Sequence, residues 1–334
     1  MLATLLFAGL LGVPVRDPDQ VLGSRFWMVP VAMAVLWAAD IVPRATSRSG
    51  WRPRAWGPAA KEVIAERWTR RRAIGVVVAI ISFYAVYLSY RNVKSFLPLV
   101  RPESYDGFLL DVDRVLFLGH DPGTLLQDLL GTGVAAHVLS SAYLFFLSFI
   151  PISLGLALVW SRDARPGLWY VTALSLNWIL GVASYYVLPA FGPIYVAPFL
   201  FDELPATGAS RLQELLATDR LSFIITPEAS EQAQSIAAFA SLHVSIVFTA
   251  ALIARLVRAP RPLEIGLWIF LGLTILSTVY LGWHYFVDDI AGIALGAAAV
   301  YLGARATGYP YTPFERVREW LARDRRMPSR EPAS

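Results

Sequence analysis

The sequence predicts an all-α fold, a polytopic bundle of helices in a membrane. Of its 334 residues, 56% are hydrophobic and only 16% are charged, a composition typical of integral membrane proteins. Several apolar stretches are long enough to cross a hydrocarbon core of roughly 30 Å. Each of them must be helical, because lipid offers the backbone no hydrogen-bond partners.

The apolar stretches follow one another from residue 26 to residue 302. We expect spans at Phe26–Val42, Ala73–Tyr90, Ala135–Trp160, Leu168–Pro189, Ser241–Val257, Ile265–Leu281 and Val287–Leu302. Residues 1–15 are also apolar, but they lack the basic flank and the cleavage site of a signal peptide. Whether they form a further short span is left open.

Arginine clusters predict the orientation of the spans, since short loops rich in Lys and Arg stay in the cytoplasm. Arginines gather at residues 44–72, 162–165 and 255–261 and in the tail after residue 305. We therefore expect a plasma-membrane protein with a cytoplasmic C-terminus and its long outer loops on the extracytoplasmic side. The basic tail is interpreted as a solvated end or a contact for anionic lipid, and nothing indicates a nucleic-acid partner.

The two long outer segments differ in character. SYDGFLLDVDRVLFLGHDP, at residues 104–122, places apolar residues at helical spacing with carboxylates between them, which predicts a helix lying in the membrane interface. LPAFGPIYVAPF, at residues 188–199, carries prolines and a glycine that forbid a continued helix. The chain has no cysteine, which excludes disulfides, a thiol nucleophile and thiolate metal sites.

A histidine and two aspartates interrupt the apolar sequence STVYLGWHYFVDDIAG at residues 277–292. Titratable groups at membrane depth are costly and usually functional. Asp288 follows His284 by four residues, which on a helix stacks the carboxylate over the imidazole. Such a carboxylate can hold one ring nitrogen protonated and leave the other free to act as a nucleophile.

A second histidine, His243, begins the span after the second outer segment. The predicted topology brings it to the same membrane face as His284, where it could protonate a leaving oxygen as a general acid. These residues predict a phosphoryl-transfer or hydrolytic site. Two histidines and two carboxylates would also suit zinc or manganese, and spacing alone leaves that alternative open.

These segments resemble the type 2 phosphatidic acid phosphatase superfamily. Its second signature is Pro-Ser-Gly-His, and residues 240–243 read Ala-Ser-Leu-His. Its third is Ser-Arg, five residues, His, three residues and Asp, and residues 277–288 match this spacing with Thr278 in place of the arginine that holds phosphate. The Ser-Leu-His form and the two outer segments are more similar to the inositol phosphorylceramide synthase branch, membrane phosphotransferases with a His-His-Asp triad.

The resemblance covers residues 73–304. It implies that His284 attacks phosphorus and becomes a transient phosphohistidine, that Asp288 orients it, and that His243 protonates the departing group. Ser241 would contact phosphate at the place of the signature serine. The resemblance also implies chemistry without a metal or cofactor.

The same resemblance implies a division of the chain. A six-helix core of the phosphatase type would be preceded by one or two N-terminal spans. The expected parts are N-terminal span or spans with a basic loop (1–72), a catalytic membrane domain (73–305) and a basic cytoplasmic tail (306–334).

The first signature of the phosphatases is Lys, six residues and Arg-Pro, and KSFLPLVRP at residues 94–102 fits it. Lys94 and Arg101 are therefore candidates to clamp phosphate. Chance, or a basic interfacial segment, is the favoured explanation of the match, because two further spans separate it from the second signature. Arg211 and Arg220 are weaker candidates for the fixed positive charge that a transferring phosphoryl group needs.

We expect a lipid phosphotransferase with a phospholipid or polyprenyl-phosphate donor and an alcohol or water acceptor. The alternative within the superfamily is a lipid phosphate or polyprenyl pyrophosphate phosphatase. From other classes, a proton-coupled transporter and a lipid-binding member without catalysis remain.

The remaining titratable and aromatic residues have simpler interpretations. Asp289 is interpreted as a polar helix cap, in preference to a second support for the histidine. His137 is interpreted as a hydrogen-bonded residue between helices and His120 as a loop or cap residue. Three aromatic residues near His284 are interpreted as interface anchors, in preference to substrate contacts. They are Tyr280, Trp283 and Tyr285.

Overall fold

The computed structural model describes residues 1–18, 28–159, 164–230 and 233–310. Over these ranges the chain forms thirteen α-helices and one short 3₁₀ helix, with no strand, which confirms the predicted all-α class. Four predicted features lie outside the described residues: the start of the first span at Phe26, the end of the third span at Trp160, the arginine at position 162 and the basic tail from residue 311 onwards.

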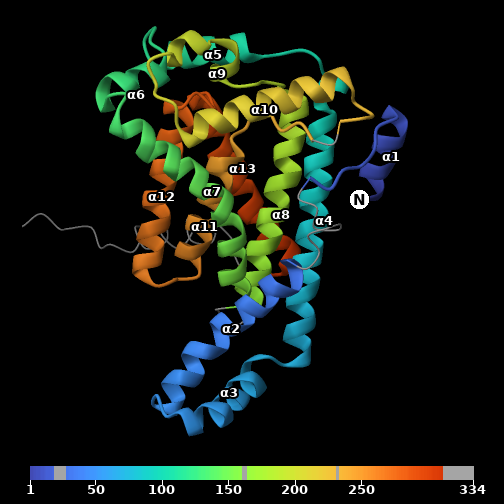
Figure 1. Ribbon diagram of the computed structural model, residues 1–334, viewed down its shortest axis with the longest axis vertical. Helices are drawn as coiled ribbons and strands as arrows, with labels where there is room; N and C mark the ends of the chain where they lie inside the picture. Colours follow the sequence, from blue (N-terminus) through green and yellow to red (C-terminus); the bar gives the residue numbers. More distant parts are fainter. Residues whose placement is uncertain (19–27, 160–163, 231–232, 311–334) are drawn as a thin grey trace, which may run out of the picture.

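Among the described residues, five helices are long and apolar enough to cross a membrane, which agrees with five of the predicted spans and indicates an integral membrane protein. A further apolar helix, α11 (Leu242–Leu256), has 15 residues and a length of about 23 Å. Most of these helices run along the long axis of the molecule (Figure 1). The five are α4 (Arg70–Val100), α7 (Val134–Val159), α8 (Ala164–Val187), α12 (Arg261–Tyr280) and α13 (Phe286–Thr307).

The first predicted span is not among these five. The helix at that place, α2 (Met28–Ser49), continues well beyond Val42 and becomes polar. Its Asp40 is buried and forms ion pairs with Arg44 and with Arg67 of the following helix, α3 (Pro53–Arg67). The pair with Arg67 joins α2 and α3 into a hairpin at the lower end of the bundle in Figure 1.

The N-terminal helix α1 (Leu2–Leu11) is too short to cross a membrane alone. Its 10 residues extend about 15 Å, half of the hydrocarbon core. It lies against α4, where the rings of Phe7 and Phe96 meet edge to face at 5.8 Å.

Small residues allow α13 to approach its neighbours closely. A Cβ at Gly292 would lie 2.4 Å from the carbonyl oxygen of Ser241, and one at Gly296 would lie 2.7 Å from that of Ser245. Glycines four residues apart let two membrane helices bring their backbones together. α11 therefore packs directly on the first turns of α13, where Asp288 lies.

Polar side chains fix α11 against α8 inside the bundle. Asn177 of α8 donates to the Thr249 hydroxyl at 3.0 Å, and the Ser245 hydroxyl donates to the Asn177 side-chain oxygen. All three side chains are buried. Because lipid offers no alternative partner, such bonds define how one helix sits on the next.

Short helices lie across the upper end of the bundle in Figure 1, which we call the covered end. Among them, α5 (Asp106–Leu116) confirms the helix predicted between residues 104 and 122. Its Phe108 and Val115 are exposed, whereas Asp106 and Asp113 are buried. The acidic face thus turns inward. The others are α6 (Pro122–Leu130), α9 (Pro193–Val196), the 3₁₀ helix η1 (Pro198–Phe201) and α10 (Gly208–Ile225).

Candidate active site

His284 lies in the tight turn between α12 and α13, at the covered end. The backbone N–H groups of Trp283 and His284 both donate to the Thr278 carbonyl, at 2.9 and 3.2 Å, which closes the end of α12. Gly282 makes the turn possible because its φ of 71° lies in the left-handed region, where a side chain would be strained. The turn fixes His284 one residue before the cap of α13.

Asp288 lies beside His284, as the spacing predicts. Its Oδ2 accepts a 3.1 Å hydrogen bond from the Tyr285 N–H and lies 3.3 Å from Nδ1 of His284. A carboxylate at the third position of a helix normally reaches back to the capping backbone in this way. The same oxygen therefore caps α13 and orients the imidazole.

His243 approaches the other edge of the His284 ring. Its Nδ1 lies 3.3 Å from Nε2 of His284. Since Nδ1 of His284 faces a carboxylate, the tautomer that satisfies both contacts carries the proton of His284 on Nδ1 and that of His243 on Nδ1. The structure thus brings the three residues predicted from sequence together at one place.

Two aromatic rings support His243 in this position. Tyr143 of α7 lies between His243 and Trp283, with 4.7 Å between ring centres on each side, and is nearly parallel to the tryptophan at 6°. Phe146 meets the histidine ring at 4.3 Å. Trp283 is therefore a buried support for the site and not an interface anchor, and Tyr280 and Tyr285 are buried as well.

Ser241 and Asp289 hold the surrounding helices together. The Ser241 N–H donates to the Asp288 carbonyl at 3.0 Å, which ties the start of α11 to α13. The Asp289 carboxylate accepts from the Thr278 hydroxyl at 2.9 Å and from Ser241. The prediction that Asp289 caps the helix is wrong, because its side chain is buried between α11, α12 and α13. Ser241 is itself fully buried.

Two aspartates of α5 hold the turn from above, and sequence reasoning missed both. The Asp113 carboxylate accepts from the N–H groups of Phe286 and Val287 at 2.7 and 3.0 Å. These are the first two residues of α13, so a residue more than 170 positions away satisfies the orphan donors of that helix. Burial raises the pKa of Asp113 to about 6, against the two backbone donors that lower it.

Asp106 likewise accepts backbone hydrogen bonds from the second outer segment. It accepts from the N–H groups of Phe191 and Gly192 at 2.9 to 3.0 Å and from the Tyr285 hydroxyl at 2.9 Å. Asp106 and Asp113 are seven residues apart and share one helix face with the buried Leu109. The seven-residue spacing was the sequence signal that could have identified both aspartates as buried. A helix face that combines two acids with a leucine is unusual on a solvent-exposed helix.

A cavity of about 560 Å³ begins at the two histidines and extends between α4 and α7. Lys94 of α4 shares this cavity, and its ammonium lies 4.7 Å from the centre of the Tyr185 ring. Arg91 lines the cavity one turn below. The remaining lining is mostly apolar and aromatic. The cavity therefore has a cationic end beside the histidines and is apolar along the rest of its length.

Arg101, the other half of the predicted clamp, is not brought to the cavity. It lies at the end of α4, where it donates to the Tyr186 carbonyl at 2.6 Å and pairs with Glu103 at 3.1 Å. About two helical turns, which include Pro98, separate it from Lys94 along the helix. The structure therefore separates the two residues that the sequence pattern paired.

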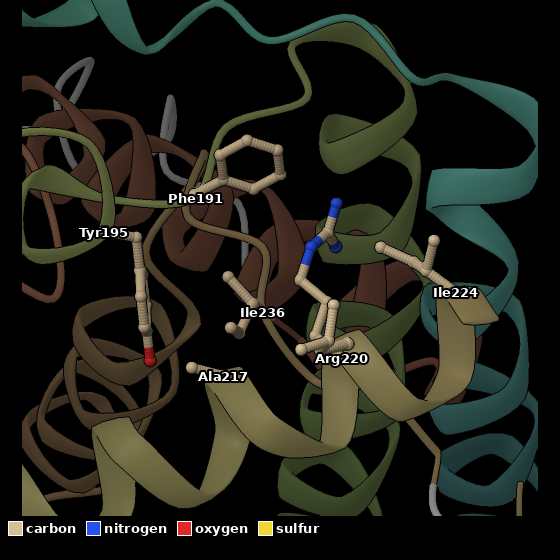
Figure 2. Close-up of a pocket in the computed structure, with 7 residues that line it drawn as sticks. Phe191, Tyr195, Ala217, Arg220, Ile224 and Ile236 are labelled. Atoms are coloured by element: carbon tan, nitrogen blue, oxygen red, sulfur yellow. The ribbon is translucent and has the colours of Figure 1, made fainter.

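Arg220 lines a second, smaller pocket of about 270 Å³ under α10 (Figure 2). Its guanidinium lies 4.4 Å from the centre of the Phe191 ring and donates to Gln234 at 3.3 Å. Gln234 in turn donates to the Lys94 carbonyl at 2.8 Å, which links the two pockets. Arg211 is exposed on the same helix.

The other histidines lie away from the site. His137 is exposed on α7, so the prediction of a bonded interhelical residue is wrong. The buried face of this part of α7 carries Ala136, Leu139 and Ser140, and position 137 falls on the opposite side. His120 lies in the connection between α5 and α6, as predicted. Within the described ranges, no three His, Asp or Glu side chains are grouped as metal ligands.

An all-helical membrane bundle with two histidines and an aspartate above a largely apolar cavity has the architecture of an enzyme for amphiphilic substrates. A family model described as the PAP2 superfamily matches residues 107–302, more than half of the chain. The chain belongs to this superfamily, which agrees with the resemblance of its motifs and indicates a lipid enzyme of the phosphatase or phosphotransferase type. No curated protein and no solved structure matches it. The inositol phosphorylceramide synthase branch stays a prediction.

Proposed function

We propose that this protein is a membrane-embedded lipid phosphotransferase that works through a phosphohistidine on His284. The observation that carries the proposal is the position of His284, with Asp288 at 3.3 Å from one ring nitrogen and His243 at 3.3 Å from the other. Substrates are a phospholipid or polyprenyl-phosphate donor and an alcohol acceptor. Lys94, in the same cavity, supplies positive charge for the phosphoryl oxygens.

In the first step, Nε2 of His284 attacks phosphorus and the bond from phosphorus to the leaving oxygen breaks. Burial lowers the pKa of His284 to about 4, so the ring is neutral near pH 7 and its lone pair is free. Nδ1–H donates to Asp288, which balances the positive charge that develops on the ring. His243 enters this step protonated on both ring nitrogens, gives its Nδ1 proton to the leaving oxygen and becomes the neutral imidazole.

In the second step, the acceptor hydroxyl attacks the phosphohistidine and His243 takes its proton. The bond from Nε2 to phosphorus breaks, and His284 returns to its neutral form. Because the two rings contact each other directly, the phosphoryl group must enter between Nε2 of His284 and Nδ1 of His243. A small displacement of the His243 ring, which the Tyr143 and Phe146 contacts limit, accompanies binding.

Thr278 supports transfer over hydrolysis. The phosphatases keep an arginine at this signature position, whereas Thr278 is buried and bonded to Asp289 and to the carbonyls of its own helix. A different phosphate clamp fits the resemblance to the inositol phosphorylceramide synthase branch. The superfamily match equally supports the alternative, a lipid phosphate or polyprenyl pyrophosphate phosphatase.

The arginine clusters support an extracytoplasmic site. The basic connections lie at the lower end of the bundle, with Arg67 and Arg72 bonded to the Val159 carbonyl at the end of α7. The covered end carries the turn between α12 and α13, which contains His284. Under the positive-inside rule the lower end is cytoplasmic and the site faces outward.

The test uses the purified full chain in detergent with phosphorus-labelled phosphatidic acid, a polyprenyl pyrophosphate and an inositol phospholipid, with and without alcohol acceptors. Label on a new lipid supports transfer, whereas free phosphate alone indicates a phosphatase. Rapid quenching under alkaline conditions should trap label on the protein. His284→Ala should abolish turnover and labelling, by at least about a thousandfold.

His137→Ala is the matched control, because that histidine is exposed on α7 away from the site. It should turn over and label like the wild type. Turnover that survives in His284→Ala would exclude this nucleophile. If no donor reacts, and the protein instead takes up protons while it transports a solute, the transporter alternative would be favoured.

A further inference from the structure

The cavity below the histidines continues to the far end of the bundle. On α4 its lining runs from Lys94 down to Ile80, which are 14 residues apart and therefore separated by about 21 Å. On α7 it runs from Phe146 to Leu158. The cavity is therefore elongated along α4 and α7, with its cationic groups at one end only.

The far end of the cavity is lined by α2, which lies outside the matched superfamily region. Met33 and Leu36 of α2 line the cavity together with Gly155 and Leu158 of α7. A Cβ at Gly155 would lie only 2.3 Å from Cδ2 of Leu36. Leu36 therefore reaches the backbone of α7 at a position where only glycine leaves room, and the two residues form a wall.

This wall is held by a buried polar network and not by apolar contact alone. Asp40, one turn beyond Leu36, accepts from the Arg67 guanidinium at 3.0 Å and from the Trp68 indole at 2.9 Å. Arg67 also donates to the Val159 carbonyl at 3.1 Å. The network fastens the α2–α3 hairpin to the end of α7, so the wall stays in place when the cavity is filled.

We propose that Leu36 and Gly155 set the length of the hydrocarbon tail that the substrate can place in this cavity. The inference rests on the proposed function, because a phosphate held beside Lys94, His243 and His284 directs the tail of its lipid along the cavity toward α2. Each methylene that fits raises the apparent affinity about fourfold. A methylene beyond the wall has no room and gains nothing.

The first test measures kcat/KM for a series of monoalkyl phosphates of increasing chain length in mixed micelles. The wild type should rise with length to a maximum and then fall or level off. Leu36→Ala should move the maximum to tails longer by about three methylene groups, the carbons that the substitution removes. Leu36→Phe should move it to shorter tails.

Val35→Ala is the matched control, since its side chain lies on the same helix but is exposed and away from the cavity. It should keep the wild-type maximum. An unchanged length profile in Leu36→Ala and Leu36→Phe, in proteins that still turn over, would overturn the proposal.

A second test does not depend on any α2 variant folding. A monoalkyl phosphate with a photoreactive diazirine at the tail end is bound to the wild type and to His284→Ala, irradiated, and the labelled peptides are identified. Labelling around residues 33–36 or 155–158 in both proteins supports the wall. Labelling confined to the lipid-facing side of α12 would overturn it.

The two tests separate this inference from the proposed function. If the tail end labels α2 but no donor undergoes phosphoryl transfer or hydrolysis, the tail site would be supported and the proposed mechanism contradicted. Turnover that depends on His284 with labelling elsewhere would keep the mechanism and remove the tail site.

Discussion

The Asp113 carboxylate accepts a 2.7 Å hydrogen bond from the backbone N–H of Phe286, the first residue of α13. A second bond, from Val287, is 3.0 Å long. Asp113 thus holds the first turn of the helix, which also carries Asp288, and through Asp288 it fixes the ring of His284. A side chain outside the cavity therefore determines the position of the proposed nucleophile.

Asp113→Asn should lower both stability and activity, because an amide can accept only one of the two bonds and turns its NH₂ group toward the other donor. The unsatisfied donor should lower the free energy of unfolding by about 1 to 3 kcal/mol. We expect kcat/KM to fall about tenfold or more, measured beside thermal unfolding in detergent. Asp111→Asn, on the exposed face of the same helix, should change neither.

The pH dependence of stability distinguishes this role from a general loss of packing. Burial raises the pKa of Asp113 from 3.8 to about 6, so its contribution to stability is complete below its unfolded pKa and is lost as the pH rises through about 6. Asp113→Asn lacks this titration. The difference in unfolding temperature between wild type and variant should therefore be larger at pH 5 than at pH 7, and an equal difference would contradict the raised pKa.

The fold and the histidine cluster could be predicted because their signals are local. Long apolar runs require helices, and the four-residue spacing of His284 and Asp288 predicts that they are neighbours, although His284 lies in the turn before α13 and not on the helix itself. The support from Asp113 could not be predicted in this way, because it depends on a contact between residues far apart in sequence. Asp289 was misread for a related reason: a polar residue near a helix start suggests a cap, whereas the packing of α11 and α12 turns it inward.

The N-terminal region shows a further limit of the apolar pattern. The run that begins near Phe26 resembles a span in composition, but Asp40 at its end is buried in ion pairs with α3. The apolar pattern does not show whether Asp40 marks the end of a membrane span or forms an ion pair between two helices. The position of α3 decides between these two cases. In the same way, KSFLPLVRP fits a signature in letters, yet only Lys94 reaches the cavity, because Arg101 lies about two turns farther along α4.

Gly292→Val should disrupt the site through the contact of α11 with α13. Its Cβ would lie 2.4 Å from the Ser241 carbonyl, so α11 must move and carry His243 away from His284. Overpacking should lower the free energy of unfolding by about 1 to 3 kcal/mol. A misplacement of about 1 Å should lower kcat about a hundredfold. Both are measured in the purified variant.

Gly272→Ala provides the control for this substitution. That glycine lies on α12, and a Cβ there would meet nothing within 4 Å. Alanine should leave activity unchanged and raise helix stability slightly. Equal activity in Gly292→Val and Gly272→Ala would show that the close approach of α11 does not matter for catalysis.

Tyr143→Leu should release His243 while leaving the nucleophile in place. The variant loses two ring stacks, on His243 and on Trp283, each worth about 0.5 to 1.5 kcal/mol. We expect kcat to fall about tenfold with a smaller change in KM. Tyr143→Phe keeps both stacks and should stay close to the wild type, so a large loss in that variant would instead assign a role to the hydroxyl.

The pH dependence of activity should reveal the buried state of His284. Its pKa is lowered to about 4 because burial disfavours the charged ring. Protonation removes the nucleophilic lone pair, so kcat/KM should fall as the pH drops through about 4 and not through the ordinary histidine value of 6.5. The measurement is an initial-rate profile from pH 3.5 to 8, with circular dichroism at each pH as the check that the fold persists. An acidic limb near 6.5 would contradict the lowered pKa of His284.

Lys94 and Arg101 should behave differently although the sequence pattern pairs them. Lys94→Met keeps the length of the side chain but removes the positive charge at the cavity, and the loss of one donor to a phosphoryl oxygen should lower kcat/KM about a hundredfold or more. Arg101→Gln removes an ion pair with Glu103, a partly exposed contact worth about 0 to 1 kcal/mol. Its kcat/KM should stay within about fivefold of the wild type. If Arg101→Gln instead loses as much activity as Lys94→Met, with its unfolding temperature unchanged, both residues would have to reach the phosphate, and the end of α4 would have to move toward the histidines when substrate binds.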